Sequence, residues 1–143
     1  MAGGAPFALQ ASTTEQVVVD WRTGLAIHGF DPVAYFTDQR ALLGRPELEL
    51  PFSGAVWRFR NIGNRAAFTQ RPDIYTPRFG GYDPLAVARG AATPGHPLLW
   101  LIVDDRLYFF QTVETRNAFK LDAEQAINAA AAKWPELKRE LVP

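Results

Sequence analysis

GFDPVAY at residues 29–35 and GYDPLAV at residues 81–87 are nearly the same heptapeptide, and the predicted fold is built around these two segments. Both copies place an aspartate, Asp31 or Asp83, directly before a proline. An aspartate carboxylate accepts hydrogen bonds from the first free N–H groups of a helix, and proline is well tolerated at the first helical position because its missing N–H is not needed there. Each copy therefore predicts a short helix that begins just after its aspartate.

The similarity between the two copies extends beyond the heptapeptide. FSGAVWRFRNIGNRAAF at residues 52–68 aligns with VDDRLYFFQTVETRNAF at residues 103–119 at a shift of 51 positions, whereas the heptapeptides are 52 positions apart. One residue has therefore been gained or lost between the two motifs. We interpret the chain as an internal duplication of a helix–hairpin–helix unit of about fifty residues, with pseudo-repeats at 29–75 and 81–127.

Each copy also contains a strand pair and a further helix. Alternating apolar residues flank Ser53-Gly54 in the first copy and Asp104-Asp105 in the second, and these residue types favour tight hairpin turns. The further helix is expected to begin near a capping residue, which is Asn61 or Asn64 in the first copy and Thr112 or Thr115 in the second. The predicted fold is α+β, a single domain of antiparallel β-hairpins and short helices.

The flanking segments set the predicted boundaries of this domain. Residues 1–16 are predicted to be a disordered or flexible lead, and the domain is expected to cover residues 17–134. Residues 123–134 are alanine-rich and predict a helix, which Pro135 is expected to end. Residues 135–143 are then a polar C-terminal tail.

Composition excludes several classes of function. Lys plus Arg and Asp plus Glu number 15 each, so the formal net charge is 0 and no basic excess is available to neutralise nucleic-acid phosphates. Cysteine is absent, which excludes disulfides, cysteine-ligated zinc, iron–sulfur clusters and thiol catalysis. No run of residues approaches the ~20 apolar residues that a membrane-spanning helix needs. We expect a cytoplasmic protein if the sequence is complete and a periplasmic one if a signal peptide has been removed.

Several motifs in order give the chain a family resemblance. GFDPVAYF, WRFRNIGNRAAF, RPDIYTPRFGGYDPLAVARG, PGHPLLWLIVDDRLYF and AAAAKWPEL together resemble a YHS domain-containing protein over residues 23–134. The resemblance implies a small α+β module found mostly in bacteria, whose stand-alone versions are often exported. Metal binding through cysteine has been suggested for related modules on metal-transporting ATPases. This chain has Asp83 where many relatives have that cysteine, and His96 where many have aspartate, so the metal role is not carried over.

Four residues form a candidate metal or acid/base set: His28, Asp31, Asp83 and His96. Imidazoles in glycine- and proline-rich loops, beside two carboxylates that pseudo-symmetry could bring together, could ligate a metal ion or shuttle protons. The two histidines lack the close spacing typical of transition-metal sites, and both aspartates stand where helix capping requires them. We favour two helix caps and two separate loop histidines, and no cofactor is predicted.

A second candidate site lies in the segment YTPRFGGY, which joins the two copies. Its glycines let the backbone approach another group closely, and a crevice between two pseudo-symmetric halves is expected to open there. The predicted ligand-binding residues are Tyr75, Arg78, Gly81, Tyr82 and, from the first copy, Tyr35. The alternative is that the segment is a tight connector and that the aromatic side chains belong to the hydrophobic core.

Three functions are compatible with these residues. The leading hypothesis is a non-enzymatic module that binds a small ligand or ion in the crevice between the pseudo-repeats. The alternatives are a protein-interaction or structural module without a small ligand, and a metal-dependent enzyme that uses the Asp/His set. Nucleophilic catalysis has no support, because cysteine is absent and no serine stands in a GxSxG context. The expected partner is a small ligand or another protein, and the protein is expected to be a monomer or a small homo-oligomer.

Overall fold

Two β-hairpins, one in each half of the sequence, organise the structure. The computed structural model describes residues 15–142 and has the mixed helix-and-strand architecture that the sequence predicts. The strands are β1 (Arg45–Phe52) and β2 (Ala55–Phe59) in the first hairpin, and β3 (His96–Val103) and β4 (Arg106–Phe110) in the second. The helices are η1 (Ile27–Gly29), α2 (Ala34–Thr37), α3 (Ile62–Gln70), α4 (Pro72–Tyr75), η2 (Arg78–Gly81), α5 (Pro84–Ala88), α6 (Val113–Leu121) and α7 (Ala123–Arg139).

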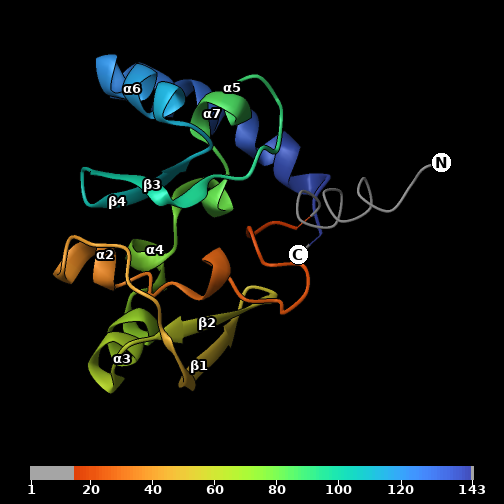
Figure 1. Cartoon of the computed structure of the whole chain (residues 1–143). Helices are drawn as coiled ribbons and strands as arrows, with labels where there is room; N and C mark the ends of the chain where they lie inside the picture. The colour runs from red at the N-terminus through yellow and green to blue at the C-terminus, as the bar shows by residue number, and fades with distance from the viewer. Residues whose placement is uncertain (1–14, 143) are drawn as a thin grey trace.

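The two hairpins lie in separate layers of the molecule (Figure 1). β3 and β4 lie beside α5, α6 and α7, β1 and β2 lie with α3 at the opposite end, and α2 and α4 lie between the hairpins. Both predicted turns contain two residues of positive φ, which is 54° at Ser53 and 76° at Gly54, and 51° at Asp104 and 60° at Asp105. Positive φ at both positions is typical of the type I′ turn, whose twist matches that of the flanking strands.

The buried carboxylate of Asp31 holds the first half together. Its Oδ1 accepts hydrogen bonds from the backbone N–H groups of Val33 (2.8 Å) and Ala34 (3.3 Å), at the start of α2. Its Oδ2 accepts from the backbone N–H of Arg60, directly after β2, and from Nδ2 of Asn64 in α3, both at 2.8 Å. One carboxylate thus joins the start of one helix, the end of the hairpin and the first turn of the next helix.

Asp83 makes the corresponding hydrogen bonds in the second half. Its Oδ1 accepts from the backbone N–H of Leu85 (2.9 Å), and its Oδ2 accepts from the backbone N–H of Gln111 (2.9 Å) and the hydroxyl of Thr115 (2.7 Å). Gln111 and Thr115 stand 51 positions after the two residues that donate to the second oxygen of Asp31.

Asp83 is the N-cap of α5, as predicted. The prediction that a helix begins directly after Asp31 is wrong, because α2 begins at Ala34, and the Asp31 carboxylate instead binds the N–H groups of the turn that leads into this helix. Each aspartate also binds its hairpin.

Both candidate capping residues of each further helix are used, but for different purposes. The side chain of Asn61 caps α3 by accepting from the backbone N–H of Asn64 at 2.7 Å, and Thr112 caps α6 by accepting from that of Thr115 at 3.1 Å. The side chains of Asn64 and Thr115 instead donate to the buried aspartates. The first residue of each pair therefore begins the helix, and the second attaches the helix to the carboxylate.

A glycine before each hairpin shows the same correspondence. The backbone N–H of Gly44 donates to the carbonyl of Gly29 (2.8 Å), and that of Gly95 donates to the carbonyl of Gly81 (2.9 Å). A Cβ atom at Gly44 would lie 2.4 Å from the backbone of Arg58, and one at Gly95 would lie 2.5 Å from Cβ of Phe109. Both positions lack room for any side chain, so the two halves share this close approach of backbone to strand.

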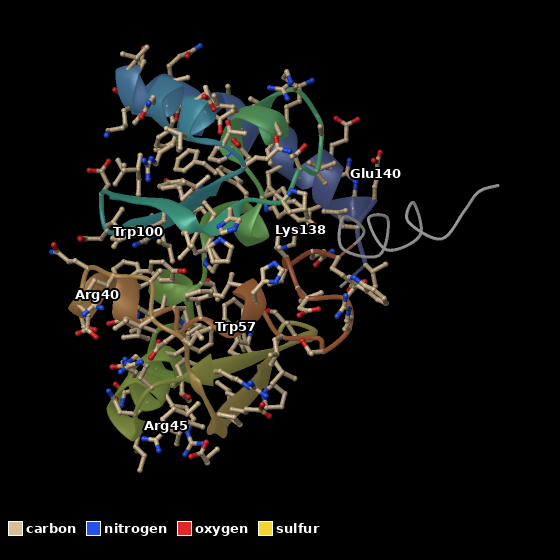
Figure 2. All side chains as sticks on the ribbon, in the orientation of Figure 1. Arg40, Arg45, Trp57, Trp100, Lys138 and Glu140 are labelled. Atoms are coloured by element: carbon tan, nitrogen blue, oxygen red, sulfur yellow. The ribbon has the colours of Figure 1, made fainter. Side chains whose placement is uncertain are left out.

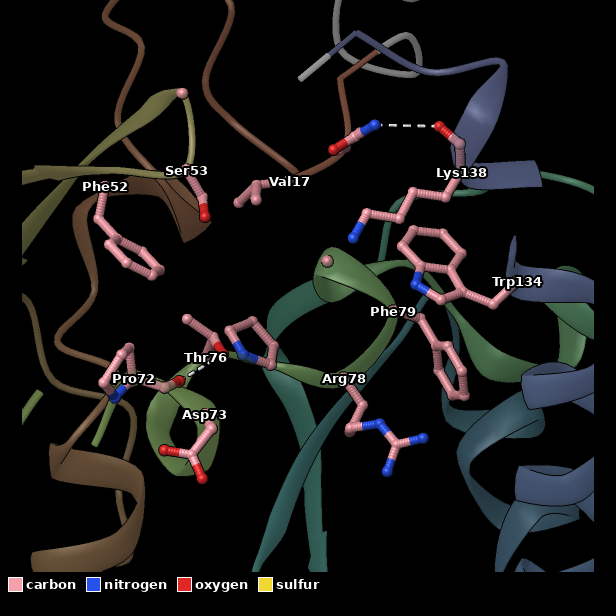
Figure 3. A pocket seen from close by; sticks show the side chains of 14 residues that line it. Val17, Phe52, Ser53, Pro72, Asp73, Thr76, Arg78, Phe79, Trp134 and Lys138 are labelled. Atoms are coloured by element: carbon pink, nitrogen blue, oxygen red, sulfur yellow. Dashed lines mark hydrogen bonds between the residues drawn. The ribbon is translucent and has the colours of Figure 1, made fainter. Parts of the chain in front are cut away.

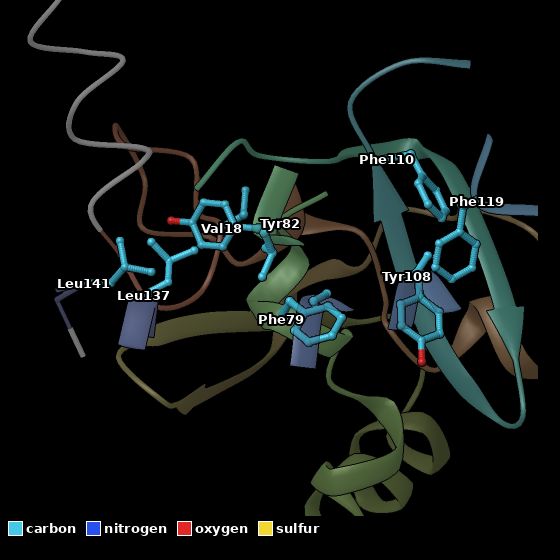
Figure 4. Packing of buried hydrophobic residues seen from close by; sticks show 11 residues of the cluster. Val18, Phe79, Tyr82, Tyr108, Phe110, Phe119, Leu137 and Leu141 are labelled. Carbon is cyan, nitrogen blue, oxygen red and sulfur yellow. The ribbon is translucent and has the colours of Figure 1, made fainter. Parts of the chain in front are cut away.

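β4 contributes to two hydrophobic cores. Tyr108 and Phe110 point to one side of the strand and contact Phe119 of α6, with ring centroids 5.2 and 5.0 Å apart. They belong to the second-half core (Figure 4), whose buried members are Val18, Phe79, Tyr82, Val87, Tyr108, Phe110, Phe119, Ala126, Ala130, Leu137 and Leu141. Leu107 and Phe109 alternate with them and are also buried, on the side that faces the first half. Both faces of β4 are therefore buried, which its unbroken apolar sequence LYFF makes possible.

β2 buries only one face, as a half-exposed hairpin strand does. Trp57 is completely buried (Figure 2), and it belongs to the first-half core, whose buried members are Val19, Ala26, Ile27, Val33, Tyr35, Ala55, Trp57, Phe59, Phe68, Leu107 and Phe109. The side chain of Tyr35 joins this core to the second hairpin. Its ring makes edge-on contacts with Trp100 and Phe109, and its hydroxyl donates to the carbonyl of Pro97 at 2.8 Å.

The C-terminal helix departs from the prediction. α7 runs from Ala123 to Arg139, so the prediction that Pro135 ends it and begins a polar tail is wrong. A proline inside a helix costs ~3 kcal/mol, but Leu137 and Leu141 beyond it are buried in the second-half core. Burial of a leucine side chain contributes ~1.5–3 kcal/mol, so these two residues are sufficient to keep the segment packed on the core.

The predicted flexible lead falls mainly outside the described residues. Its last two residues, Glu15 and Gln16, are described and lie beside Val142, with the backbone N–H of Gln16 donating to the Val142 carbonyl at 2.7 Å. The next residues of the chain turn back on themselves, and Val19 pairs with Ala26 in an antiparallel bridge.

Replacement of either buried aspartate is expected to destabilise the protein. Asp31→Ala should lower the free energy of unfolding by about 3 kcal/mol or more, because several buried donors lose their acceptor at roughly 1–3 kcal/mol each. Equilibrium urea unfolding measures this change, and Asp38→Ala, at an exposed aspartate after α2, is the control, with an expected change within about 0.5 kcal/mol. Equal stability of the two variants would contradict the structural role of Asp31.

Candidate functional site

A cleft of about 770 Å³ opens between the two halves, beside the segment that connects them (Figure 3). We call it the inter-half cleft, and it is lined by residues 16–17, 52–54, 72–73 and 76–80 together with Trp134 and Lys138. The first hairpin contributes its turn, α4 contributes its first residues, and α7 contributes its last two turns. The crevice that the sequence predicts at the connector therefore has a counterpart in the structure.

The backbone of the connector fixes the floor of the inter-half cleft. Phe79 (φ 57°) and Gly80 (φ 63°) are both in the left-handed region, which turns the chain sharply within η2. A Cβ atom at Gly80 would lie 1.9 Å from the carbonyl oxygen of Gln16, and the carbonyl of Gly80 accepts from the N–H of Val18 at 2.8 Å. Only glycine leaves room for the N-terminal segment at this point.

Aromatic side chains form the two walls of the cleft. Phe52, at the end of β1, lies on one wall, and Trp134 of α7 lies on the other (Figure 3). Trp134 is held in place by edge-on contact with Phe79, with ring centroids 5.9 Å apart. These rings give the cleft an apolar surface of the kind that small-molecule sites use.

The charged groups of the cleft are unequally compensated. Asp73 forms an ion pair with Arg71, whose guanidinium nitrogens lie 2.9 and 3.1 Å from the carboxylate oxygens, and this hydrogen-bonded partner lowers the pKa of Asp73. Arg78 and Lys138 have no ion-pair partner within residues 15–142. The charge of Asp73, the one acidic residue in the described lining of the cleft, is therefore balanced by Arg71. Among the described residues, Arg78 and Lys138 line the cleft without such a partner.

The predicted ligand-binding residues are only partly gathered here. Arg78 lines the inter-half cleft, but Tyr75 packs edge-on against Phe36 at 5.2 Å. Tyr82 and Gly81 are buried beneath the cleft, and Tyr35 is buried at the contact between the hairpins. The aromatic members of the set therefore pack in or against the hydrophobic core, as the alternative interpretation of this segment expects. A ligand-binding role for the set stays a prediction.

The predicted metal set is split between different surroundings. His28 and His96 line a smaller pocket of about 360 Å³ with Phe30, Pro94 and Pro97, whereas the carboxylates of Asp31 and Asp83 are occupied by the hydrogen bonds of the caps. Nδ1 of His96 accepts from the backbone N–H of Leu98 at 3.0 Å. Within residues 15–142, no group of three His, Asp or Glu side chains is placed to hold a metal ion.

The aromatic and cationic lining residues outside the connector that were not identified from the sequence are Phe52, Trp134 and Lys138. Lys138 lines the cleft because α7 continues past Pro135, Trp134 lies one residue before that proline, and Phe52 lines the cleft because the first hairpin turn approaches the connector. The spacing of Trp134 and Lys138, four positions apart and so on one face of a helix, is the signal that could have indicated them.

Comparison with known proteins adds no relative. No family model, curated protein or solved structure matches the chain. In the part of the chain that the structure describes, no helix is both long and apolar enough to cross a membrane. The candidate site is therefore judged on its own geometry.

The two buried tyrosines near the sites predict a loss of stability in alkali. Burial raises the pKa of Tyr35 and of Tyr82 above the ordinary value, with a smaller contribution from the charges of Asp31 and Glu15. The unfolded chain releases these phenolic protons near pH 10 while the folded protein keeps them, so the folded state loses stability as the pH rises above that value.

We expect the free energy of unfolding to fall between about pH 9 and 11, and to fall less steeply in Tyr35→Phe. Urea unfolding at a series of pH values measures both slopes. The variant should also lose about 1 kcal/mol at neutral pH, because the carbonyl of Pro97 loses its donor. Identical slopes for the two proteins would show that Tyr35 ionises equally in the folded and unfolded states.

Proposed function

We propose that the protein is a non-enzymatic binding module and that a small ligand occupies the inter-half cleft. The observation that carries the proposal is the combination of aromatic walls with two uncompensated cations, Arg78 and Lys138, in one cleft between the halves. A volume of about 770 Å³ is within the usual range of small-molecule sites.

The titratable groups of the cleft support binding more than catalysis. Arginine stays protonated in proteins and lysine is a cation at neutral pH, so neither is an ordinary general base. Asp73 is exposed and is kept ionised by Arg71, without the raised pKa that a carboxyl acid catalyst needs. The described lining therefore offers charge and apolar surface to a ligand, and it has no pair of groups suited to proton transfer.

Two further inferences accompany this proposal. The matching hydrogen bonds of Asp31 and Asp83 support an internal duplication, in which the cleft arose where the two copies meet. The ordered motifs noted in the sequence support membership of the YHS domain family, in a version without the cysteine. Under this proposal the protein binds its ligand through the junction between the copies, and the metal chemistry suggested for relatives plays no part.

Thermal unfolding with a panel of metabolites and ions tests the proposal. A compound that binds should raise the melting temperature by an amount that grows with its concentration. Ser53→Tyr should lower the affinity for that compound by at least about tenfold. Ser53 points toward the cleft, so a tyrosine side chain at this position would fill part of it (Figure 3).

The second hairpin offers a matched control. Asp104 has the same place in its turn as Ser53 and nearly the same φ, 51° against 54°, but it is exposed away from the cleft. Asp104→Tyr therefore carries a similar backbone cost and should leave binding unchanged. Binding that both variants reduce equally would place the ligand elsewhere, and no response to the whole panel would favour the protein-interaction alternative.

A further inference from the structure

We propose that the inter-half cleft selects an organic anion with a flat apolar body. In this assignment a carboxylate or phosphate group of the ligand contacts Arg78 and Lys138, and the apolar body lies along Trp134. The assignment rests on the proposed function and names the chemical class of its ligand. The charge of the cleft, its restrained arginine and the position of the indole ring support it.

The cleft has a local excess of positive charge. The whole chain has a formal charge of 0, but the cleft holds Arg78, Lys138 and a single acid, Asp73, which already pairs with Arg71. Cations without a counter-ion attract an anionic group, and hydrogen bonds between charged partners are about twice as strong as neutral ones. A ligand with a negative group would therefore gain an interaction that a neutral ligand of the same shape lacks.

The guanidinium of Arg78 is restrained before a ligand binds. Its central carbon lies 5.0 Å from the ring centroid of Phe79, a side chain that is itself buried. Stacking on a fixed ring restricts the guanidinium before a ligand arrives, while its edge keeps the N–H groups that can bind a carboxylate or phosphate through two hydrogen bonds. Less conformational entropy is then lost on binding.

The two cations lie near an aromatic surface. Figure 3 shows the amine of Lys138 directed into the cleft beside Trp134, and the guanidinium of Arg78 beside the ring of Phe79, which itself contacts Trp134. The carbonyl of Lys138 accepts from Nε2 of Gln16 at 3.1 Å, which fixes this end of α7 beside the cleft. A planar ligand that lies on the indole would therefore have the amine of Lys138 at one edge, and this pattern fits an aromatic acid better than a bare ion.

Isothermal titration calorimetry with three probes of one shape tests the assignment. The probes are 1-naphthoate, 1-naphthyl phosphate and the neutral 1-naphthamide. We expect at least one of the two anions to bind about tenfold or more tightly than the amide, and the better anion identifies the head group. Its affinity should also fall as salt is added, because the cations are partly exposed.

Variants of the two cations locate the interaction. Arg78→Gln and Lys138→Gln should each lower the affinity for the preferred anion by about tenfold and leave the affinity for the amide unchanged. The matched controls are Lys133→Gln and Arg139→Gln. Both remove an exposed cation from α7, the helix of Lys138, at a position outside the cleft lining, and neither should change the affinity for the anion or for the amide.

The assignment would be overturned by equal affinity for the anions and the amide, or by anion binding that resists loss of both cations. Absence of binding by both anions would also overturn it. The proposed function fails separately, since it requires only that some compound binds and that Ser53→Tyr weakens this binding. Binding of the amide that is lost in Ser53→Tyr would thus retain the module and reject the anionic ligand.

Discussion

The structure depends on one repeated interaction, a buried aspartate whose two oxygens bind three separate elements. Asp31 and Asp83 are almost completely removed from solvent, and a buried carboxylate is tolerated only where donors satisfy it. The donors come from the start of a helix, the residue after a strand and the first turn of the next helix. Each aspartate therefore fixes the position of a whole unit, and the remaining side chains pack within that framework.

This framework explains where the inter-half cleft lies. The two units are joined by a connector that must turn sharply at Phe79 and Gly80 before the second aspartate begins its helix. The turn brings the connector against the N-terminal segment and beside the last turns of α7, while the first hairpin turn approaches from the other unit. The cleft is thus a product of how the units are linked, and its walls come from elements that the sequence keeps far apart.

The parts of the structure that rest on local signals could be predicted from the sequence. The aspartate caps and the two-residue hairpin turns follow from residue types whose conformational preferences act within a few positions. The second role of Asn64 could not be predicted, because it depends on contact with an aspartate 33 positions away. The continuation of α7 through Pro135 was likewise missed, since burial of Leu137 overrides the local preference of proline. Lys138 belongs to the candidate site only as a consequence of that tertiary packing.

The double-sided burial of β4 has a consequence for how the molecule comes apart. Leu107 and Phe109 belong to one core and Tyr108 and Phe110 to the other, so one strand is shared by both units. If the first unit unfolded alone, one face of β4 would lose its packing partners. The partially unfolded species would then expose the apolar side chains of Leu107 and Phe109. The shared strand therefore couples the two units into one cooperative transition, in spite of their separate aspartate frameworks.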